Sequence, residues 1–219
     1  MRGFKVEGII LRRRDFGEAD RILTVFTHQL GKISVLAKGV RRITSRRAGN
    51  VELLNRVQMY LYQGKGLPIL TEAESLQTFQ KIKSDLTLSA YAYHIIELVD
   101  KLTAENQENR TLYEFLVEVL KRLERNPRQI LVRAFEAKIL SNSGFISFNT
   151  KGVYLTHPKG VLASHLGNLL RNLENMSWDE IEKMEISEKE ALELERVLRY
   201  HVERVIEGSL KSRKFLRKL

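Results

Sequence analysis

The first 80 residues and the rest of the chain follow different hydrophobic periods. Short apolar stretches separated by turn residues fill positions 1–80. Alternation with a period of two, together with β-branched and aromatic residues, is typical of strands. The stretches that meet these criteria are 4–11, 21–27, 32–37, 57–62 and 67–71. Five short strands without a helix predict a closed or nearly closed barrel, because closure removes exposed sheet edges.

Apolar residues recur every three or four positions after residue 80, which predicts amphipathic helices. The first three expected helices cover 86–102, 112–123 and 127–140. Ser177 and Ser187 each stand three residues before a glutamate, and this capping-box pattern predicts two further helix starts. The second box should open a long helix that ends at Gly208. Glycines, a proline and β-branched residues in 145–163 indicate a short irregular or β insertion.

The two periods predict an α+β fold in two parts. Residues 1–80 form the five-stranded barrel, and residues 81–219 form a mainly α-helical domain that contains the insertion. The chain of 219 residues is long enough to bury a sizeable core. It contains no cysteine and therefore neither a disulfide nor a thiolate metal site. Since no stretch resembles a secretion signal or a membrane span, we expect a cytoplasmic protein.

The positive charge is concentrated at the two ends of the chain. Residues 1–80 carry 14 Lys and Arg against 7 Asp and Glu, residues 81–210 carry 18 against 20, and residues 211–219 carry 5 against none. Between Arg21 and Val51 there are seven cations and no carboxylate. Such a surface releases counterions from a polyanion, the main sequence-independent contribution to nucleic-acid binding. The alternatives are a basic surface that only maintains solubility, and an anionic membrane, although the basic segments lack the amphipathic apolar face that membrane docking requires.

Short motifs spread over the whole chain resemble those of a bacterial family, the recombination mediator RecO. They are Phe-Gly-Glu-Ala-Asp-Arg at 16–21, Phe-Thr through Gly-Lys at 26–32, Ala-Lys-Gly-Val-Arg at 37–41, Ser-Arg before Gly at 45–49, Gly-Leu through Thr-Glu-Ala-Glu at 66–74, and Leu-Lys-Ser-Arg-Lys-Phe-Leu at 210–216. The resemblance implies an N-terminal OB-fold, a five-stranded barrel, followed by a helical domain. This division is the same as the one predicted from the periods.

The resemblance also implies a function and partners. RecO-like proteins bind single- and double-stranded DNA, anneal complementary strands, and act with RecR and the single-strand-binding protein SSB to promote loading of the recombinase RecA. The chain is therefore expected to be a nucleoid-associated DNA-repair protein, not an enzyme, and to need no cofactor. Many members carry a four-cysteine zinc module where this chain has residues 145–163 without a cysteine. His157 and His165 lack the neighbouring ligands that zinc requires, so we expect no metal site.

The cations of the two basic ends are the candidate DNA contacts, because arginine and lysine can follow a sugar–phosphate backbone without reading bases. The connection 38–52 is the longest and most basic, and it is expected to be a mobile loop. The arginines 12–14 would alternate sides if their strand continues, so one of them should pair with Asp15 or Glu18. The candidates are Arg12, Arg14, Lys38, Arg41, Arg42, Arg46, Arg47, Lys65, Lys211, Arg213 and Lys214.

Two groups of residues have alternative roles. Aromatic residues in the barrel would stack on bases or, more often in strands, pack against neighbouring strands. These aromatic residues are Phe16, Tyr60 and Tyr62. In the helical domain, Arg133 and Lys138 lie in a segment that is apolar nearly all round. The resemblance favours a groove there for the acidic, apolar tail of SSB, with one of these cations at its rim. The alternative is that Arg133 pairs with Glu136.

Two other functions compete with DNA mediation. Asp15, Glu18 and Asp20 would suit a metal-dependent nuclease, but three acids around Gly17 more often form a polar turn. A general RNA-binding OB protein is the stronger alternative, because charge does not separate RNA from DNA.

The last ten residues, 210–219, are expected to be ordered. Their four apolar residues fit one helical face or an apolar contact with the domain. Those residues are Leu210, Phe215, Leu216 and Leu219. The cations of residues 211–219 would then lie at fixed positions and contact DNA or a protein partner.

Overall fold

The computed structural model describes residues 3–146, 148, 156–157, 160–161 and 164–212. Their contacts form two compact units, one of residues 1–84 with 103–117 and the other of residues 85–102 with 118–219. The sequence placed residues 103–117 in the helical part, whereas their contacts are with the barrel. The domain boundary at residue 80 stays a prediction.

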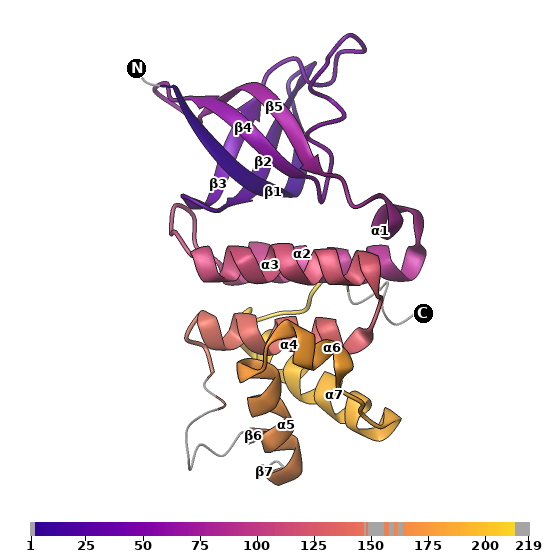
Figure 1. The fold of residues 1–219 in the computed structure, drawn as a ribbon. Helices are drawn as coiled ribbons and strands as arrows, with labels where there is room; N and C mark the ends of the chain where they lie inside the picture. The colour runs from indigo at the N-terminus through magenta and orange to yellow at the C-terminus, as the bar shows by residue number, and fades with distance from the viewer. Residues whose placement is uncertain (1–2, 147, 149–155, 158–159, 162–163, 213–219) are drawn as a thin grey trace. The chain divides into compact units, whose positions relative to one another are not determined.

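Five strands close into a barrel in the first unit, which confirms the predicted fold (Figure 1). They are β1 (Gly3–Phe16), β2 (Asp20–Thr27), β3 (Gly31–Ala37), β4 (Arg56–Tyr62) and β5 (Ile69–Gln77). Around the barrel the order is β1-β2-β3-β5-β4, with β3 and β5 parallel and the other pairs antiparallel. This closed, OB-like arrangement leaves no free sheet edge. Its core consists of inward-facing aliphatic residues such as Leu23, Val25, Val35 and Met59.

The segment 103–117 completes the barrel unit. Gly31 has a φ of +67°, and a Cβ there would lie 1.8 Å from the carbonyl oxygen of Gln107, so only glycine fits. The hydroxyl of Tyr113 donates to Glu7 at 2.8 Å, and its ring lies 6.3 Å from that of Phe26. Burial raises the pKa of Glu7, but the hydrogen bonds from Tyr113 and Arg56 outweigh it and hold that pKa below its usual value.

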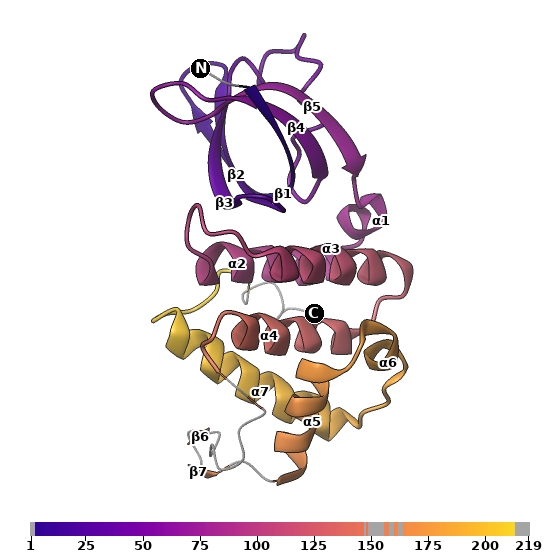
Figure 2. The same ribbon diagram turned by 60° about the vertical axis from the view of Figure 1, so that its left-hand side comes forward.

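The second unit is helical, as predicted. Its helices surround α4, whose residues 130–140 are all buried; α4 contacts α2, α5, α6 and α7 and lies between α2 and α7 (Figure 2). The helices are α1 (Gln80–Ser84) and the first half of α3 (Arg110–Arg125) in the barrel unit, and α2 (Leu86–Leu102), the rest of α3, α4 (Gln129–Asn142), α5 (Ser164–Asn175), α6 (Trp178–Lys183) and α7 (Glu188–Val205) in the helical unit. None of the described helices is both long and apolar enough to cross a membrane.

The predicted helix starts are confirmed, and two helices were missed. Ser177 and Ser187 each form the complete capping box with the glutamate three residues on. Helix α7 ends at Val205, before the predicted stop at Gly208, whose N–H donates to the carbonyl of Glu203. Helices α1 and α5 were not predicted, because one is short and the other follows the insertion without a side-chain cap signal. In the insertion, two short strands pair, β6 (Thr156–His157) and β7 (Gly160–Val161).

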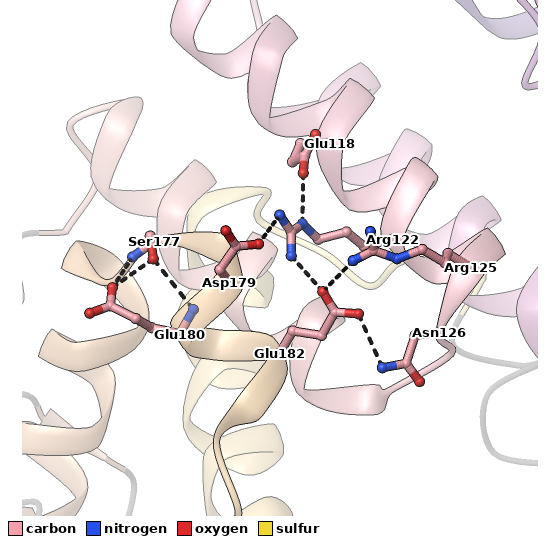
Figure 3. Close-up of polar contacts among 8 residues, drawn as sticks. All are labelled: Glu118, Arg122, Arg125, Asn126, Ser177, Asp179, Glu180 and Glu182. Carbon is pink, nitrogen blue, oxygen red and sulfur yellow. Dashed lines mark hydrogen bonds and ion pairs between the residues drawn. The ribbon is translucent and has the colours of Figure 1, made fainter.

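A half-buried arginine joins α3 to α6 in the helical unit (Figure 3). The guanidinium of Arg122 donates to Glu118 at 2.7 Å and to Asp179 at 2.6 Å, and it is also paired with Glu182. Burial lowers the pKa of Arg122, but these carboxylates outweigh it and raise that pKa above its usual value. This cation therefore holds the helical unit together and is not presented to an external anion.

Candidate nucleic-acid interface

A basic hollow opens on the barrel where β2 begins and β3 ends. The β3–β4 connection forms most of its wall, so cations that are spread over residues 38–47 are brought to one surface. Its lining residues are Asp20, Lys38, Gly39, Arg42, Thr44, Ser45, Arg46 and Arg47. Four of the predicted DNA contacts therefore lie around one concavity. Thr44 and Ser45 were missed, since nothing in their type marks them.

The β3–β4 connection is packed against the barrel, in contrast to the mobile loop expected. Val40 and Val51, near its two ends, are 1% and 0% exposed. The N–H of Gly39 donates to the Asp20 carboxylate at 2.7 Å, and that of Arg41 donates to the carbonyl of Ala19 at 2.9 Å. The many charged residues of the connection suggested a mobile loop. The two buried valines hold it in place, because buried apolar contacts restrict local unfolding whereas exposed charges contribute little to it.

Two of the predicted DNA contacts have structural roles in the connection. One guanidinium nitrogen of Arg47 donates to the carbonyl of Leu70 at 2.6 Å, and the other donates to that of Lys38 at 2.9 Å. Arg47 therefore joins the connection to β5. The guanidinium of Arg41 lies 3.4 Å from the carboxylate of Asp15. Neither side chain is fully available to a phosphate.

Three cations of the hollow are available to a ligand. Lys38, Arg42 and Arg46 are exposed, and their side chains form no hydrogen bond or ion pair with the described residues. Lys65 is also exposed but lies in the β4–β5 connection and does not line the hollow. These three side chains have no counterion among the described residues, so their charge is available to an external anion such as a phosphate, and DNA contact stays a prediction for them.

The arginines at 12–14 alternate sides because β1 continues through them, as predicted. Arg12 and Arg14 are exposed, whereas Arg13 is half-buried and pairs with Glu52. The ion pair of Arg13 is thus with Glu52, and the expected pairing of one of the three arginines with Asp15 or Glu18 stays a prediction. The partner of Arg13 could not be predicted from neighbouring residues, because β2 and β3 separate Glu52 from Arg13 in the sequence.

The acids of the β1–β2 turn do not form a metal site. Asp15 accepts from Arg21 at 3.0 Å, and this hydrogen bond, with the charge of Arg41 nearby, holds the pKa of Asp15 below its usual value. Asp20 accepts from the backbone of the connection. Within the described ranges, no group of three or more His, Cys, Asp or Glu side chains is placed to hold a metal ion.

The aromatic candidates differ in exposure. Phe16 is 50% exposed and Tyr60 43% exposed, whereas Tyr62 is half-buried. Phe16 pairs with Asp20 across the β1–β2 hairpin, which places it at the margin of the hollow. Stacking on a base remains a prediction for Phe16.

The described part of the C-terminal segment is docked on α2. Leu210 is buried, and the N–H groups of Lys211 and Ser212 donate to the two oxygens of Glu97 at 2.7 and 2.8 Å. The side chain of Lys211 is exposed. Arg213 and Lys214, with the rest of the predicted basic tail, lie outside the described residues.

The two cations proposed for a partner tail are engaged within the helical unit. Arg133 is 5% exposed and donates to Glu136 at 2.7 and 2.9 Å, which is the alternative weighed from the sequence. Burial raises the pKa of Glu136, but the charge of Arg133 and the contact with His94 outweigh it and lower that pKa. Lys138 donates to two carbonyls at the end of α5, at 2.8 and 2.9 Å. A partner site at these residues stays a prediction and would require these contacts to open.

Known families and proteins are similar to the chain along most of its described length. The family model for "Recombination protein O N terminal" matches residues 1–79, and that for "Recombination protein O C terminal" matches residues 83–147. A DNA repair protein RecO of Pelotomaculum thermopropionicum is 34% identical over 166 residues, which are 76% of this chain and 64% of that protein. Proteins of the same name from Listeria monocytogenes and Roseiflexus are 36% and 37% identical over 62% and 66% of this chain. The chain spans about half to two thirds of these relatives, with matches covering 64%, 54% and 51% of their lengths.

Proposed function

Because this chain belongs to the RecO family, whose N-terminal and C-terminal models match it in order, we propose that it is a DNA-binding mediator of repair and recombination. Its work is binding and placement of strands and not catalysis. It acts in the bacterial cytoplasm at the nucleoid. The single observation that supports this function most directly is the basic hollow with the unpaired cations Lys38, Arg42 and Arg46.

The geometry suits contacts to the backbone of DNA. Cations that contact phosphates position a strand and leave the base edges free. A strand held in this way can pair with a complementary strand, and neutralised phosphates reduce the repulsion between the two. Annealing of single strands is therefore the proposed activity, with duplex DNA as a second ligand. The helical unit and the C-terminal segment would serve protein partners, namely RecR, the tail of SSB and, indirectly, RecA.

The test compares two sets of three cations. The triple variant Lys38→Ala, Arg42→Ala and Arg46→Ala should weaken binding to unrelated single-stranded DNA sequences about equally. The slope of log K against log salt should become shallower by roughly 2, since each phosphate contact to a single strand contributes about 0.7. The matched control removes one lysine and two arginines from the exposed side of α7: Lys189, Arg196 and Arg204.

If the hollow is not the binding site, both triple variants should show the same slope of log K against log salt. Competition between DNA and RNA of equal length at fixed salt separates the RNA-binding alternative. Strand annealing in the presence of SSB separates a mediator from a passive binder, because only a mediator accelerates pairing when SSB covers the strands.

A further inference from the structure

The loop that walls the basic hollow presents one apolar side chain among its cations. We propose that Ile43 is a wedge that enters between two neighbouring bases of the DNA strand held in the hollow. This role rests on the proposed function, because it requires a strand whose phosphates lie on Arg42 and Arg46. It adds a contact with the bases to the backbone contacts of these cations.

The exposure of Ile43 is complete. Its relative exposure is 104%, whereas Leu86, another exposed aliphatic residue, reaches 74%. The N–H of Ser45 donates to the carbonyl of Arg42 at 2.9 Å, so Ile43 and Thr44 are the two central residues of a turn. A side chain at this position projects away from the loop. Ile43 therefore contributes no buried apolar surface to the stability of the barrel.

The base of this turn is fixed. The N–H of Arg42 donates to the carbonyl of Gly39, and Val40 beside it is buried in the barrel core. Arg47 closes the other side through its hydrogen bonds to Lys38 and Leu70. A short turn on a fixed base holds its apex side chain at a defined place, which lowers the entropy lost when a ligand binds.

The surroundings of Ile43 select the ligand. A single exposed isoleucine is ordinary on a protein surface. This one lies between cations that are unpaired among the described residues, in a stretch from Arg21 to Val51 without a carboxylate. Proteins that deform nucleic acids combine cations on the backbone with an isoleucine, leucine or phenylalanine inserted between base steps. The lining of the hollow contains one acid, Asp20, and the loop backbone already occupies its carboxylate.

Insertion would have a direct consequence for annealing. Unstacking one base step breaks the intrastrand stacking that a single strand must rearrange before it pairs. The phosphate contacts supply the affinity, and the wedge changes the conformation of the bound strand. The loss of Ile43 should therefore change base stacking more than it changes the salt dependence of binding.

The test measures base stacking in the complex. The probe is a single-stranded oligonucleotide in which 2-aminopurines stand between adenines, since stacking quenches their fluorescence. Saturating wild-type protein should raise the emission severalfold, and Ile43→Ala should remove at least half of that rise. Ile43→Met, which keeps an apolar side chain of similar length, should retain it. Ile43→Ala should also weaken binding roughly fivefold, with an unchanged salt slope. This loss corresponds to about half of the free energy gained when an isoleucine side chain is fully buried.

The control variant is Leu192→Ala, which truncates an aliphatic side chain that is 48% exposed on α7. It should leave both the emission and the affinity unchanged. If Ile43→Ala gives the emission and the Kd of the wild type, the proposed insertion of Ile43 between bases is wrong, and contact with a protein partner becomes the explanation for the exposed side chain. That outcome is distinct from failure of the proposed function, in which the triple cation variant keeps its affinity and its salt slope.

Discussion

Two neighbouring arginines of the β3–β4 connection have opposite roles. Arg46 is exposed and unpaired among the described residues, whereas Arg47 bridges the carbonyls of Lys38 and Leu70. Arg47→Ala should lower the free energy of unfolding by about 1–3 kcal/mol, because it leaves the carbonyls of Lys38 and Leu70 without a charged donor. Arg46→Ala, the matched control, should leave that free energy unchanged and weaken DNA binding. Urea unfolding and a binding titration of both variants measure the difference.

Equal stability of the two arginine variants would mean that Arg47 is a surface cation like its neighbour.

The sequence predicted that both arginines lie in a basic loop but could not distinguish their roles. Their difference depends on β5, whose first residues lie beside the end of β3 only after the barrel closes. The same holds for Arg13, whose partner Glu52 is remote in sequence.

At the scale of a single element, the N-terminus of α7 predicts a pH dependence. The carboxylate of Glu190 accepts hydrogen bonds from the N–H and the hydroxyl of Ser187, and it also contacts His165. The Ser187 hydrogen bonds, together with the smaller effect of His165, lower the pKa of Glu190 from 4.5 to about 2. A lowered folded-state pKa stabilises the fold above pH 4.5, and this stabilisation is lost as the pH falls towards 2. Glu190→Gln should therefore reduce the stability at neutral pH and flatten its decline between these values.

Thermal unfolding as a function of pH measures this effect. Glu188→Gln removes the same charge from the same helical turn but none of the bonds of the capping box, and it should leave the slope between pH 4.5 and 2 near that of the wild type. Identical pH profiles for the two variants would show that the box does not bind the ionised carboxylate. Both boxes could be predicted because each is complete within four residues, whereas α5 has no such local signal.

The C-terminal segment predicts different results for two truncations. Removing residues 210–219 should lower the melting temperature, because Leu210 leaves a buried site and Glu97 loses two N–H donors. Removing only residues 213–219, which contain four of the five cations, should lower DNA affinity while it keeps the contacts of Leu210 and Glu97 that the longer truncation removes. Thermal unfolding and salt-dependent binding of both variants give the two readouts. A shorter truncation that binds DNA like the wild type would assign these charges to a protein partner.

On the scale of the whole molecule, the two-part organisation was predictable and its division in space was not. Hydrophobic period changes from two to nearly four at residue 80, and that change located the barrel and the helices. The packing of residues 103–117 against the barrel depends on Gly31, Tyr113 and Glu7, which are remote from one another in sequence. The same limit applies to the basic hollow, because its cations were found but its closure by the β3–β4 connection was not.

The last prediction concerns an isolated barrel. A fragment of residues 1–80 contains all five strands but lacks 103–117, so Glu7 loses the Tyr113 hydroxyl, and the backbone at Lys32 loses its 2.8 Å bond from the N–H of Asn106. Phe26 loses its aromatic neighbour and is exposed to water at the position of Tyr113. We expect the fragment to unfold at a lower urea concentration than the barrel of the full chain, or without cooperativity, with strand amide exchange as the measurement. Tyr113→Phe in the full chain isolates the hydroxyl and should cost about 1 kcal/mol, clearly less than the truncation. Equal protection of the β2 amides in fragment and full chain would instead make residues 1–80 a self-sufficient domain, as the hydrophobic periods alone predicted.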